Sequence, residues 1–388
     1  MNITWVTRSF LDYRIPIYIE LNKLCNNNLS VLYYKDVVPE RCQEKLRAVL
    51  GERAVGLTGE FRICGKKNQP LSSMKNNFHR IPIQPGLLKT IKKTKPAIIL
   101  TDGFFQWTYA AYLYKIFYKI PHIMLYEGTE HTERNVGLLK IKFRKLASQF
   151  IDVIHCNGVL CEAFLKNVLN IKQSKISIGN MASDVTTLQE SCKQFSENEK
   201  LIFKKSLHLK GNVFLFVGRL VPLKGLNYLL EVWKNLNLEN FSLLIVGNGE
   251  QAQELREYSD KYGLKNIFFE KAVSNDIIYK YFTIADCFII PTLQDNWSLV
   301  VPEAMSCKLP IICSKYNGCH PELVKSVNGW VFDPLNKRSF LETLNTAVKN
   351  KNKWKKMGEA SLELIEDFSP KIVSTQIFES CRKIINHK

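Results

Sequence analysis

Residues Pro291–Pro310, PTLQDNWSLVVPEAMSCKLP, decide the fold because they join a strand to a helix. They follow the apolar run Cys287–Ile290, which is typical of a buried parallel strand. A polar turn over Gln294–Asn296 leads into a helix that we expect to begin near Ser298, a favourable N-cap residue. In open α/β sheets, ligands bind in the loops at the carboxyl ends of such strands. This stretch therefore predicts a ligand site.

Two acids, Asp295 and Glu303, flank this turn with seven residues between them. Asp295 is expected in the loop and Glu303 in the first turns of the helix. The unpaired N–H groups at the start of a helix carry partial positive charge and suit a phosphate group. Carboxylates beside such a seat suit the hydroxyls of a sugar and a ribose. The alternative is structural: Asp295 caps the turn and Glu303 is a helix-start acid.

Strands and helices alternate on both sides of this stretch. Such alternation predicts parallel sheets with right-handed crossovers. In the second half we expect strands at Val213–Val217, Ser242–Val246, Ile267–Glu270, Pro310–Cys313 and Trp330–Phe332. In the first half we expect them at Ile3–Thr7, Leu29–Tyr34, Phe61–Lys67, Ala97–Leu100, His122–Tyr126, Asp152–Cys156 and Lys175–Asn180.

The second half contains four further motifs. They are FVGRL at Phe216–Leu220 followed by Lys224-Gly225, LIVGNGE at Leu244–Glu250, NGCHPE at Asn317–Glu322 and GWVFD at Gly329–Asp333. With Asp295-x7-Glu303, these segments resemble the family 4 retaining glycosyltransferases. The resemblance implies a GT-B fold, in which two Rossmann-like, doubly wound parallel-sheet domains face each other across a cleft.

The resemblance also implies a division of labour between the two halves. Residues 1–182 would bind the acceptor, and residues 183–369 would bind the nucleotide-sugar donor. The helix within residues 370–388 would pack back on the first domain. The polar stretch 183–200, SDVTTLQESCKQFSENEK, separates the halves and is interpreted as a hinge.

The resemblance assigns roles to residues of the second half. Arg219 and Lys224 would grip the diphosphate, Asp295 would face the donor sugar, and Glu303 would face the ribose. The remaining donor-binding residues are expected to be Gly218, Gly225, Gly249, Val273, Ser298 and Leu299. Three positions depart from the usual pattern: Asp295 replaces Glu, and Ser298 and Lys271 stand where Gly is common. These departures leave the sugar and the base, UDP or GDP, open.

The first half, residues 1–182, resembles the family more loosely. Glu127 follows a strand at a position where the family often has His or Glu, so we expect it to face the active cleft and act in catalysis. Arg8, Ser9 and Phe10 occupy the first loop, where many members have two glycines, and are expected to contact the acceptor, as is His131. The alternative for Glu127 and His131 is an ordinary place at the surface.

Charge is unevenly distributed along the chain of 388 residues, whose net charge is +18. Residues 1–182 hold 27 Lys and Arg against 13 Asp and Glu, whereas residues 183–388 hold 27 against 23. An anionic partner is therefore expected, and an anionic membrane surface is favoured over nucleic acid, for which no motif is present. The helix predicted at Leu138–Ile151 combines an apolar face with Lys140, Lys142, Arg144 and Lys145. It would either touch the bilayer or pack on its own domain.

The eleven cysteines have no pattern typical of a disulfide framework or a zinc site, which favours a reducing cytosol. Neither a signal peptide nor a spanning segment is evident, so we expect a cytoplasmic protein, peripheral at the inner face of the membrane.

The predicted function is transfer of a hexose from a UDP- or GDP-sugar to a lipid-linked or lipopolysaccharide-type glycan, with retention and without a metal or cofactor. The alternatives are a nonhydrolysing UDP-sugar epimerase of the same fold and a non-catalytic nucleotide-sugar-binding scaffold.

Overall fold

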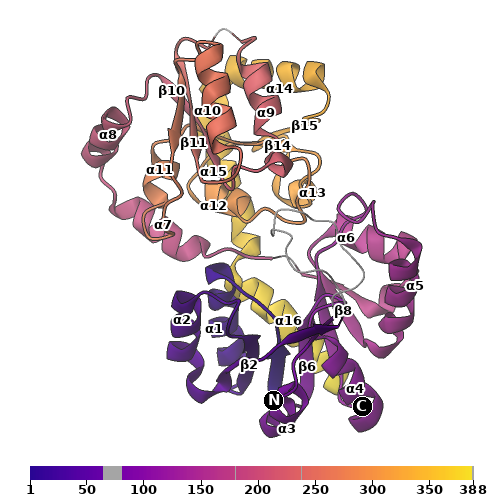
Figure 1. Cartoon of the computed structure of the whole chain (residues 1–388). Coiled ribbons are helices and arrows are strands. Elements are labelled where there is room, and N and C mark those ends of the chain that lie inside the picture. The colour runs from indigo at the N-terminus through magenta and orange to yellow at the C-terminus, as the bar shows by residue number, and fades with distance from the viewer. Residues whose placement is uncertain (64–80, 180, 237, 387–388) are drawn as a thin grey trace. The chain divides into compact units, whose positions relative to one another are not determined.

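The computed structural model describes residues 1–63, 81–179, 181–236 and 238–386. The chain forms two compact units (Figure 1). The first comprises Met1–Ala182 together with Pro370–Lys388, and the second comprises Ser183–Ser369. Each unit is built on a parallel sheet of its own, which confirms the two doubly wound parallel-sheet domains expected from the sequence.

The first unit contains a seven-stranded parallel sheet in the order β3-β2-β1-β6-β7-β8-β9. Its strands are β1 (Ile3–Val6), β2 (Leu29–Tyr34), β3 (Ala54–Leu57), β6 (Ile98–Asp102), β7 (His122–Tyr126), β8 (Val153–Cys156) and β9 (Ile176–Ile178). The expected strand at Phe61–Lys67 is shorter: β4 (Phe61–Ile63) pairs with β5 (Ile81–Ile83), and residues 64–67 lie outside the described residues.

Helices cover both faces of this sheet because its strands are apolar on both faces. One face packs against α1 (Ile15–Leu24), α2 (Glu40–Leu50) and α16 (Pro370–Asn386). The other packs against α3 (Leu87–Thr94), α4 (Tyr109–Tyr118), α5 (Leu138–Ala147) and α6 (Val159–Ala163). Alternate residues of one strand serve the two faces: Trp5 of β1 belongs to the first core and Val6 to the second.

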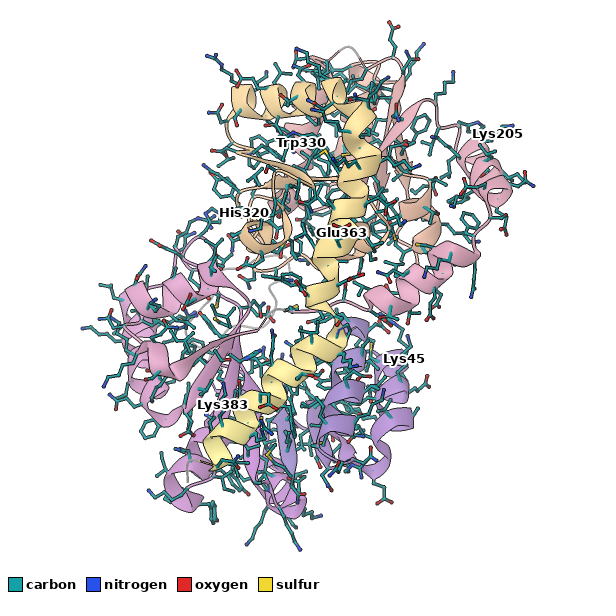
Figure 2. The ribbon with its side chains drawn as sticks, turned by 180° about the vertical axis from the view of Figure 1, so that it is seen from behind. Lys45, Lys205, His320, Trp330, Glu363 and Lys383 are labelled. Atoms are coloured by element: carbon teal, nitrogen blue, oxygen red, sulfur yellow. The ribbon has the colours of Figure 1, made fainter. Side chains whose placement is uncertain are left out.

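The last helix, α16, is part of the first unit although it follows the second in the chain. It lies beside α1 (yellow in Figure 1), and Figure 2 shows it from behind with Lys383 near its carboxyl end. Val373, Ile377 and Cys381 face the core at helical spacing, and the Ser374 hydroxyl donates to the Ile17 carbonyl at 3.0 Å. This helix is therefore a core element of the first unit.

The second unit contains a six-stranded parallel sheet in the order β12-β11-β10-β13-β14-β15. Its strands are β10 (Asn212–Val217), β11 (Phe241–Val246), β12 (Ile267–Glu270), β13 (Cys287–Ile290), β14 (Ile311–Ser314) and β15 (Gly329–Phe332). Its helices are α7 (Val185–Gln194), α8 (Glu197–Ser206), α9 (Leu226–Trp233), α10 (Ala252–Lys261), α11 (Tyr279–Thr283), α12 (Val300–Ser306), α13 (His320–Leu323), α14 (Lys337–Lys349) and α15 (Trp354–Ile365).

The polar stretch 183–200, interpreted above as a hinge, contains α7 and the start of α8. Asp184 caps α7 by accepting from the amide of Thr187, and Ser196 forms a capping box with Glu199 at the start of α8. α7 also packs against α12. These residues are therefore structured elements of the second unit.

The docking of α16 gives a stability prediction. Ile377 is 1% exposed, so Ile377→Ala removes buried methyl groups and leaves a cavity, which should cost about 2–4 kcal/mol of unfolding free energy. Lys371→Ala, at an exposed site of the same helix, should cost less than about 0.5 kcal/mol. Urea unfolding followed by circular dichroism measures both, and equal losses would contradict core packing by α16.

Candidate active site

The candidate donor site lies where β10 and β13 are neighbours in the second sheet. From β10 the chain continues to β11 on one side, and it later returns to β13 on the other side. Open α/β sheets bind ligands at this kind of switch point, outside the carboxyl ends of the two strands. Arg219 and Lys224 follow β10 there, and Asp295 and Ser298 follow β13.

An ion pair joins the two loops. Lys224 Nζ lies 2.5 Å from Asp295 Oδ2, and both side chains are mostly buried. The same carboxylate oxygen accepts from Ser298 Oγ at 2.6 Å, and Asp295 Oδ1 accepts from the Trp297 amide at 3.2 Å. These contacts join a cation, an acid, a hydroxyl and the turn that holds them.

Backbone contacts bring these loops close enough to pair. The Leu293 amide and the Thr292 hydroxyl both donate to the Leu223 carbonyl, at 2.8 and 2.9 Å. Gly225, directly after Lys224, has φ +69° and an ideal Cβ there would lie 2.2 Å from the Pro291 carbonyl oxygen. Only glycine fits this position, both for its left-handed backbone and for its contact with the next loop.

The first residues after β10 pack on the loop that follows β11. An ideal Cβ on Gly249 would lie 2.2 Å from the Leu220 carbonyl oxygen, so Gly249 permits this close approach. The turn presents Gly218 at the end of β10 and an exposed Arg219, for which no ion pair occurs among the described residues. Val273 is half-buried in the loop after β12, at the same edge of the sheet.

The phosphate seat expected from amides near Ser298 and Leu299 needs a correction. The Ser298 amide donates to Asn317 Oδ1 at 3.3 Å, because the Asn317 side chain is buried beside Asp295. The helix also begins later than expected, with Leu299 as the N-cap of α12. Ser298 therefore contributes its hydroxyl to Asp295, and its amide is engaged elsewhere.

Glu303, in the first turns of α12, is half-buried, and no hydrogen bond to its carboxyl group occurs among the described residues. Burial raises the pKa of Glu303 from 4.5 to about 8, and the nearby carboxylate of Asp184 contributes in the same direction. A carboxyl group held in this state has free hydrogen-bonding capacity for a ligand.

In the first unit, Glu127 belongs to a charged cluster that sequence reasoning missed. Arg14, whose side chain is buried, lies 3.3 Å from Asp102 Oδ1 and 3.3 Å from Glu127 Oε1. Its guanidinium also lies over the rings of Trp5 and Tyr13. Asp102 is the last residue of β6, and Glu127 directly follows β7. The cluster therefore lies at the carboxyl ends of these strands, near the switch point between β1 and β6.

The residues expected to contact an acceptor are placed differently from one another. Phe10 is 3% exposed and packs edge-on against Tyr18 and Tyr33. It therefore belongs to the core and does not contact the acceptor as expected. Arg8 makes two hydrogen bonds of 2.7 Å to Glu60. Ser9 is exposed beside it. His131 is half-buried in the turn after β7.

Helix α5 exposes its leucine side chains to solvent. Leu138, Leu139 and Leu146 are 79%, 70% and 58% exposed, whereas Lys140 and Arg144 are buried. Arg144 lies 2.9 Å from Glu133 and over the rings of Phe104, Phe105 and Tyr126. Lys140 and Arg144 therefore pack within the first unit, whereas the leucines and Lys142 face outward.

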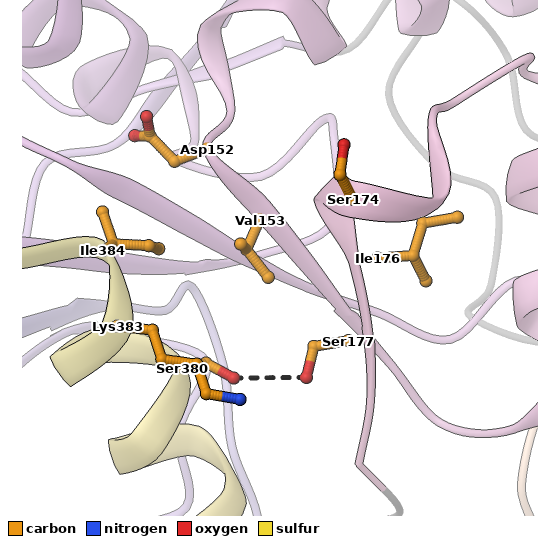
Figure 3. A pocket seen from close by; sticks show the side chains of 8 residues that line it. All are labelled: Asp152, Val153, Ser174, Ile176, Ser177, Ser380, Lys383 and Ile384. Atoms are coloured by element: carbon orange, nitrogen blue, oxygen red, sulfur yellow. Dashed lines mark hydrogen bonds between the residues drawn. The ribbon is translucent and has the colours of Figure 1, made fainter. Parts of the chain in front are cut away.

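A separate cavity of about 550 Å³ lies in the first unit between the starts of β8 and β9 and the end of α16 (Figure 3). Ser177 and Ser380 meet across it at 3.2 Å, with Lys383 beside them. Asp152 and Val153 line it at the amino-terminal end of β8, whereas Glu127 follows the carboxyl end of β7. In the described part of the chain, no cluster of His, Cys, Asp and Glu has the makeup of a metal site, and no helix is long and apolar enough to cross a bilayer.

Known proteins resemble this chain in sequence. Residues 197–363 match the family described as glycosyl transferases group 1. An uncharacterized glycosyltransferase of Methanocaldococcus jannaschii is 23% identical over 73% of this chain and 88% of its own length. The UDP-Gal:alpha-D-GlcNAc-diphosphoundecaprenol alpha-1,3-galactosyltransferase of Escherichia coli is 31% identical over 38% of this chain and 40% of its own.

Solved structures share the fold over nearly the whole chain. HepE from Anabaena, solved in complex with UDP, has a TM-score of 0.75 at 16% identity and covers 99% of this chain and 100% of its own. A glycosyltransferase from Rickettsia africae has a TM-score of 0.76 at 14% identity, covering 100% and 99%. Together, the matches show a GT-B fold for the chain and a similarity of its second unit to the glycosyl transferases group 1.

The contact of Gly225 with the loop after β13 gives one prediction. Gly225→Ala should cost about 2–4 kcal/mol of unfolding free energy, because a strained backbone is combined with a clash. Gly263→Ala is the matched control: its φ is +62°, but nothing lies within 4 Å of the ideal Cβ, so strain alone should cost about 1 kcal/mol. Equal losses in urea unfolding would contradict the close approach.

The raised pKa of Glu303 gives a second prediction. Between pH 4.5 and about 8 the unfolded state binds fewer protons at this carboxyl group than the folded state, so its contribution to stability falls as the pH rises. Glu303→Gln should remove this pH-dependent loss of stability. The unfolding free energy of the variant relative to the wild type should therefore rise by about 1–3 kcal/mol between pH 5 and 8.5. Urea unfolding across this pH range measures it, with Glu250→Gln at an exposed loop as the control. A constant difference at all pH values would contradict the assignment.

Proposed function

We propose that this glycosyltransferase transfers a hexose from a UDP- or GDP-linked donor to a lipid-linked or lipopolysaccharide-type glycan, with retention of anomeric configuration and without a metal ion. The observation that carries the proposal is the ion pair of Lys224 with Asp295, which joins the loops after β10 and β13, with Arg219 and Glu303 on the same two segments of the chain. Relatives that support this substrate class include the amylovoran biosynthesis glycosyltransferase AmsD of Erwinia amylovora, 28% identical over 46% of this chain and 50% of its own length.

On the donor side, departure of the nucleoside diphosphate builds negative charge that fixed cations stabilise. Arg219, exposed and without an ion pair among the described residues, and the Lys224 ammonium are the proposed cations. Asp295 holds Lys224 in place before the donor arrives, so the ammonium needs little reorganisation during transfer. Glu303 would accept the ribose hydroxyls. Because a carboxylate accepts more hydrogen bonds than a protonated acid, we expect donor affinity to rise toward pH 8.

On the acceptor side, Glu127 is the proposed catalytic carboxylate and Arg14 keeps it in position together with Asp102. The three side chains hold one positive and two negative formal charges. Such a cluster favours neutral hydroxyl groups at this point and disfavours a phosphate. We therefore propose that the sugar of the acceptor, and not its diphosphate, reaches Glu127. Ser9 and His131 remain proposed acceptor contacts.

The membrane surface is proposed to meet α5. Exposed Leu138, Leu139 and Leu146 would enter the interface, and exposed Lys142 would meet anionic headgroups. The helix begins at the edge of the sheet where the strands end, which is also the edge that carries Glu127. A lipid-linked acceptor held at this surface would therefore have a short path to the site.

The donor site makes a direct prediction. UDP or GDP should raise the melting temperature of the protein, and Lys224→Ala should abolish the rise and lower hydrolysis of the cognate nucleotide sugar by about 100-fold or more. Lys337→Ala is the control, because this lysine forms an exposed pair with Glu231 at 2.8 Å. A panel of UDP- and GDP-sugars identifies the donor, and the anomer of the product identifies the stereochemistry.

Two outcomes of that screen would overturn the assignment. The absence of any stabilisation by nucleoside diphosphates would remove the donor site. Conversion of a UDP-sugar to its epimer without loss of UDP would replace transfer by the epimerase alternative, and binding without hydrolysis or transfer would favour the scaffold.

The membrane surface makes a second prediction. Leu138→Ser combined with Leu139→Ser and Lys142→Glu should release the protein from vesicles that contain phosphatidylglycerol, while donor hydrolysis stays unchanged. The matched control alters a similar surface in the second unit, with Leu201→Ser, Ile202→Ser and Lys205→Glu on α8 (Figure 2). Cosedimentation measures both. If only the α8 variant is released, α5 is not the surface that binds the membrane.

A further inference from the structure

Two thiols from different helices meet beside the donor site. Cys192 lies in the last turn of α7, and Cys307 directly follows α12. Their sulfur atoms are 3.1 Å apart, although 115 positions separate the residues in the sequence. Both residues are only partly buried, whereas the other eight cysteines in the described part of the chain are buried. Of the ten cysteines that the structure describes, this pair is therefore the most accessible to a soluble oxidant.

The distance between the sulfurs is short enough for a bond to form. A disulfide needs a separation of about 2.05 Å, so the two atoms need to approach by about 1 Å. At 3.1 Å they are not bonded, and one thiol donates a weak hydrogen bond to the other sulfur. A small shift of the ends of α7 and α12 supplies this movement.

The surroundings assign different roles to the two sulfurs. The hydrogen bond from Cys307 lowers the pKa of Cys192; burial opposes this, and the charge of Lys200 adds to it. Burial raises the pKa of Cys307 well above its usual range. Cys192 is therefore the more readily ionised thiol, and a thiolate is the nucleophile in disulfide exchange.

We propose that Cys192 and Cys307 form a reversible oxidation site that ties α7 to α12 and weakens donor binding. The oxidant is a low-molecular-weight disulfide. The Cys192 thiolate attacks one of its sulfurs, which forms a mixed disulfide and releases one small thiolate. Cys307 then loses its proton and attacks the Cys192 sulfur, which releases the second small thiolate. In total, two protein thiols are oxidised to one disulfide and one small disulfide is reduced to two thiols.

The effect on the donor site follows from the two helices that the bond joins, and it rests on the proposed function. The Cys307 amide donates to the Glu303 carbonyl at 3.3 Å, so a shift of Cys307 moves the turn that carries Glu303. α7 begins after Asp184, whose charge contributes to the raised pKa of Glu303. Because binding groups act within about 0.5 Å of their productive geometry, a shift of about 1 Å should weaken UDP binding by about threefold or more.

The test uses the full chain equilibrated in buffers of reduced and oxidised glutathione. Peptide mapping by mass spectrometry without reduction should show a peptide that links Cys192 to Cys307, which disappears after dithiothreitol. Cys192→Ser and Cys307→Ser should each abolish it. The buried neighbours Cys313 and Cys319 are the internal control and should stay as thiols. UDP affinity is then measured by calorimetry for the oxidised and reduced protein and for both variants under oxidising conditions.

The outcomes separate this inference from the proposed function. A missing link in the folded wild type, or a link between other cysteines, overturns the oxidation site. A link without a change in UDP affinity overturns its effect on the donor. If the reduced protein does not bind UDP or GDP at all, the proposed function fails, while the linked peptide is still scored for the oxidation site.

Discussion

The ion pair between Lys224 and Asp295 is the interaction on which the candidate donor site depends. It joins the loops that follow β10 and β13, which are sequentially distant but adjacent in the sheet. The pair forms because Gly225 allows the first loop to lie against the Pro291 carbonyl, and because the Leu223 carbonyl ties the loops together. A mostly buried pair is costly to desolvate and is maintained only by additional hydrogen bonds, which Ser298 and Trp297 supply here.

The first unit uses the same sheet topology with a different charge arrangement. Its switch point holds a buried guanidinium, Arg14, between the carboxylates of Asp102 and Glu127. The second unit presents Arg219 without an ion pair among the described residues and Lys224 with one carboxylate. One fold repeated twice thus gives an acidic site suited to hydroxyl groups and a more basic site suited to a diphosphate. This difference matches the roles proposed for acceptor and donor.

The sequence predicts the second unit well because its strands are short apolar runs separated by amphipathic helices, and their ends differ by only a few residues from the structure. It fails where burial depends on tertiary partners. Phe10 lies in the core, and Arg144 is buried because Glu133 and nearby rings compensate its charge. Arg14 carries no local signal for its two carboxylate partners. In contrast, the Ser-x-x-Glu spacing that starts at Ser196 is a local signal for the start of α8, which the interpretation of this stretch as a hinge did not use.

The proposed donor site places a nucleoside diphosphate at the meeting point of the loops after β10 and β13. A crystal structure of the protein with bound UDP tests this most directly. We expect diphosphate oxygens within about 3 Å of Lys224 Nζ and beside the Arg219 guanidinium, with the ribose at the Glu303 carboxyl group. Density for UDP at another edge of either sheet, with Lys224 still paired only to Asp295, would contradict it.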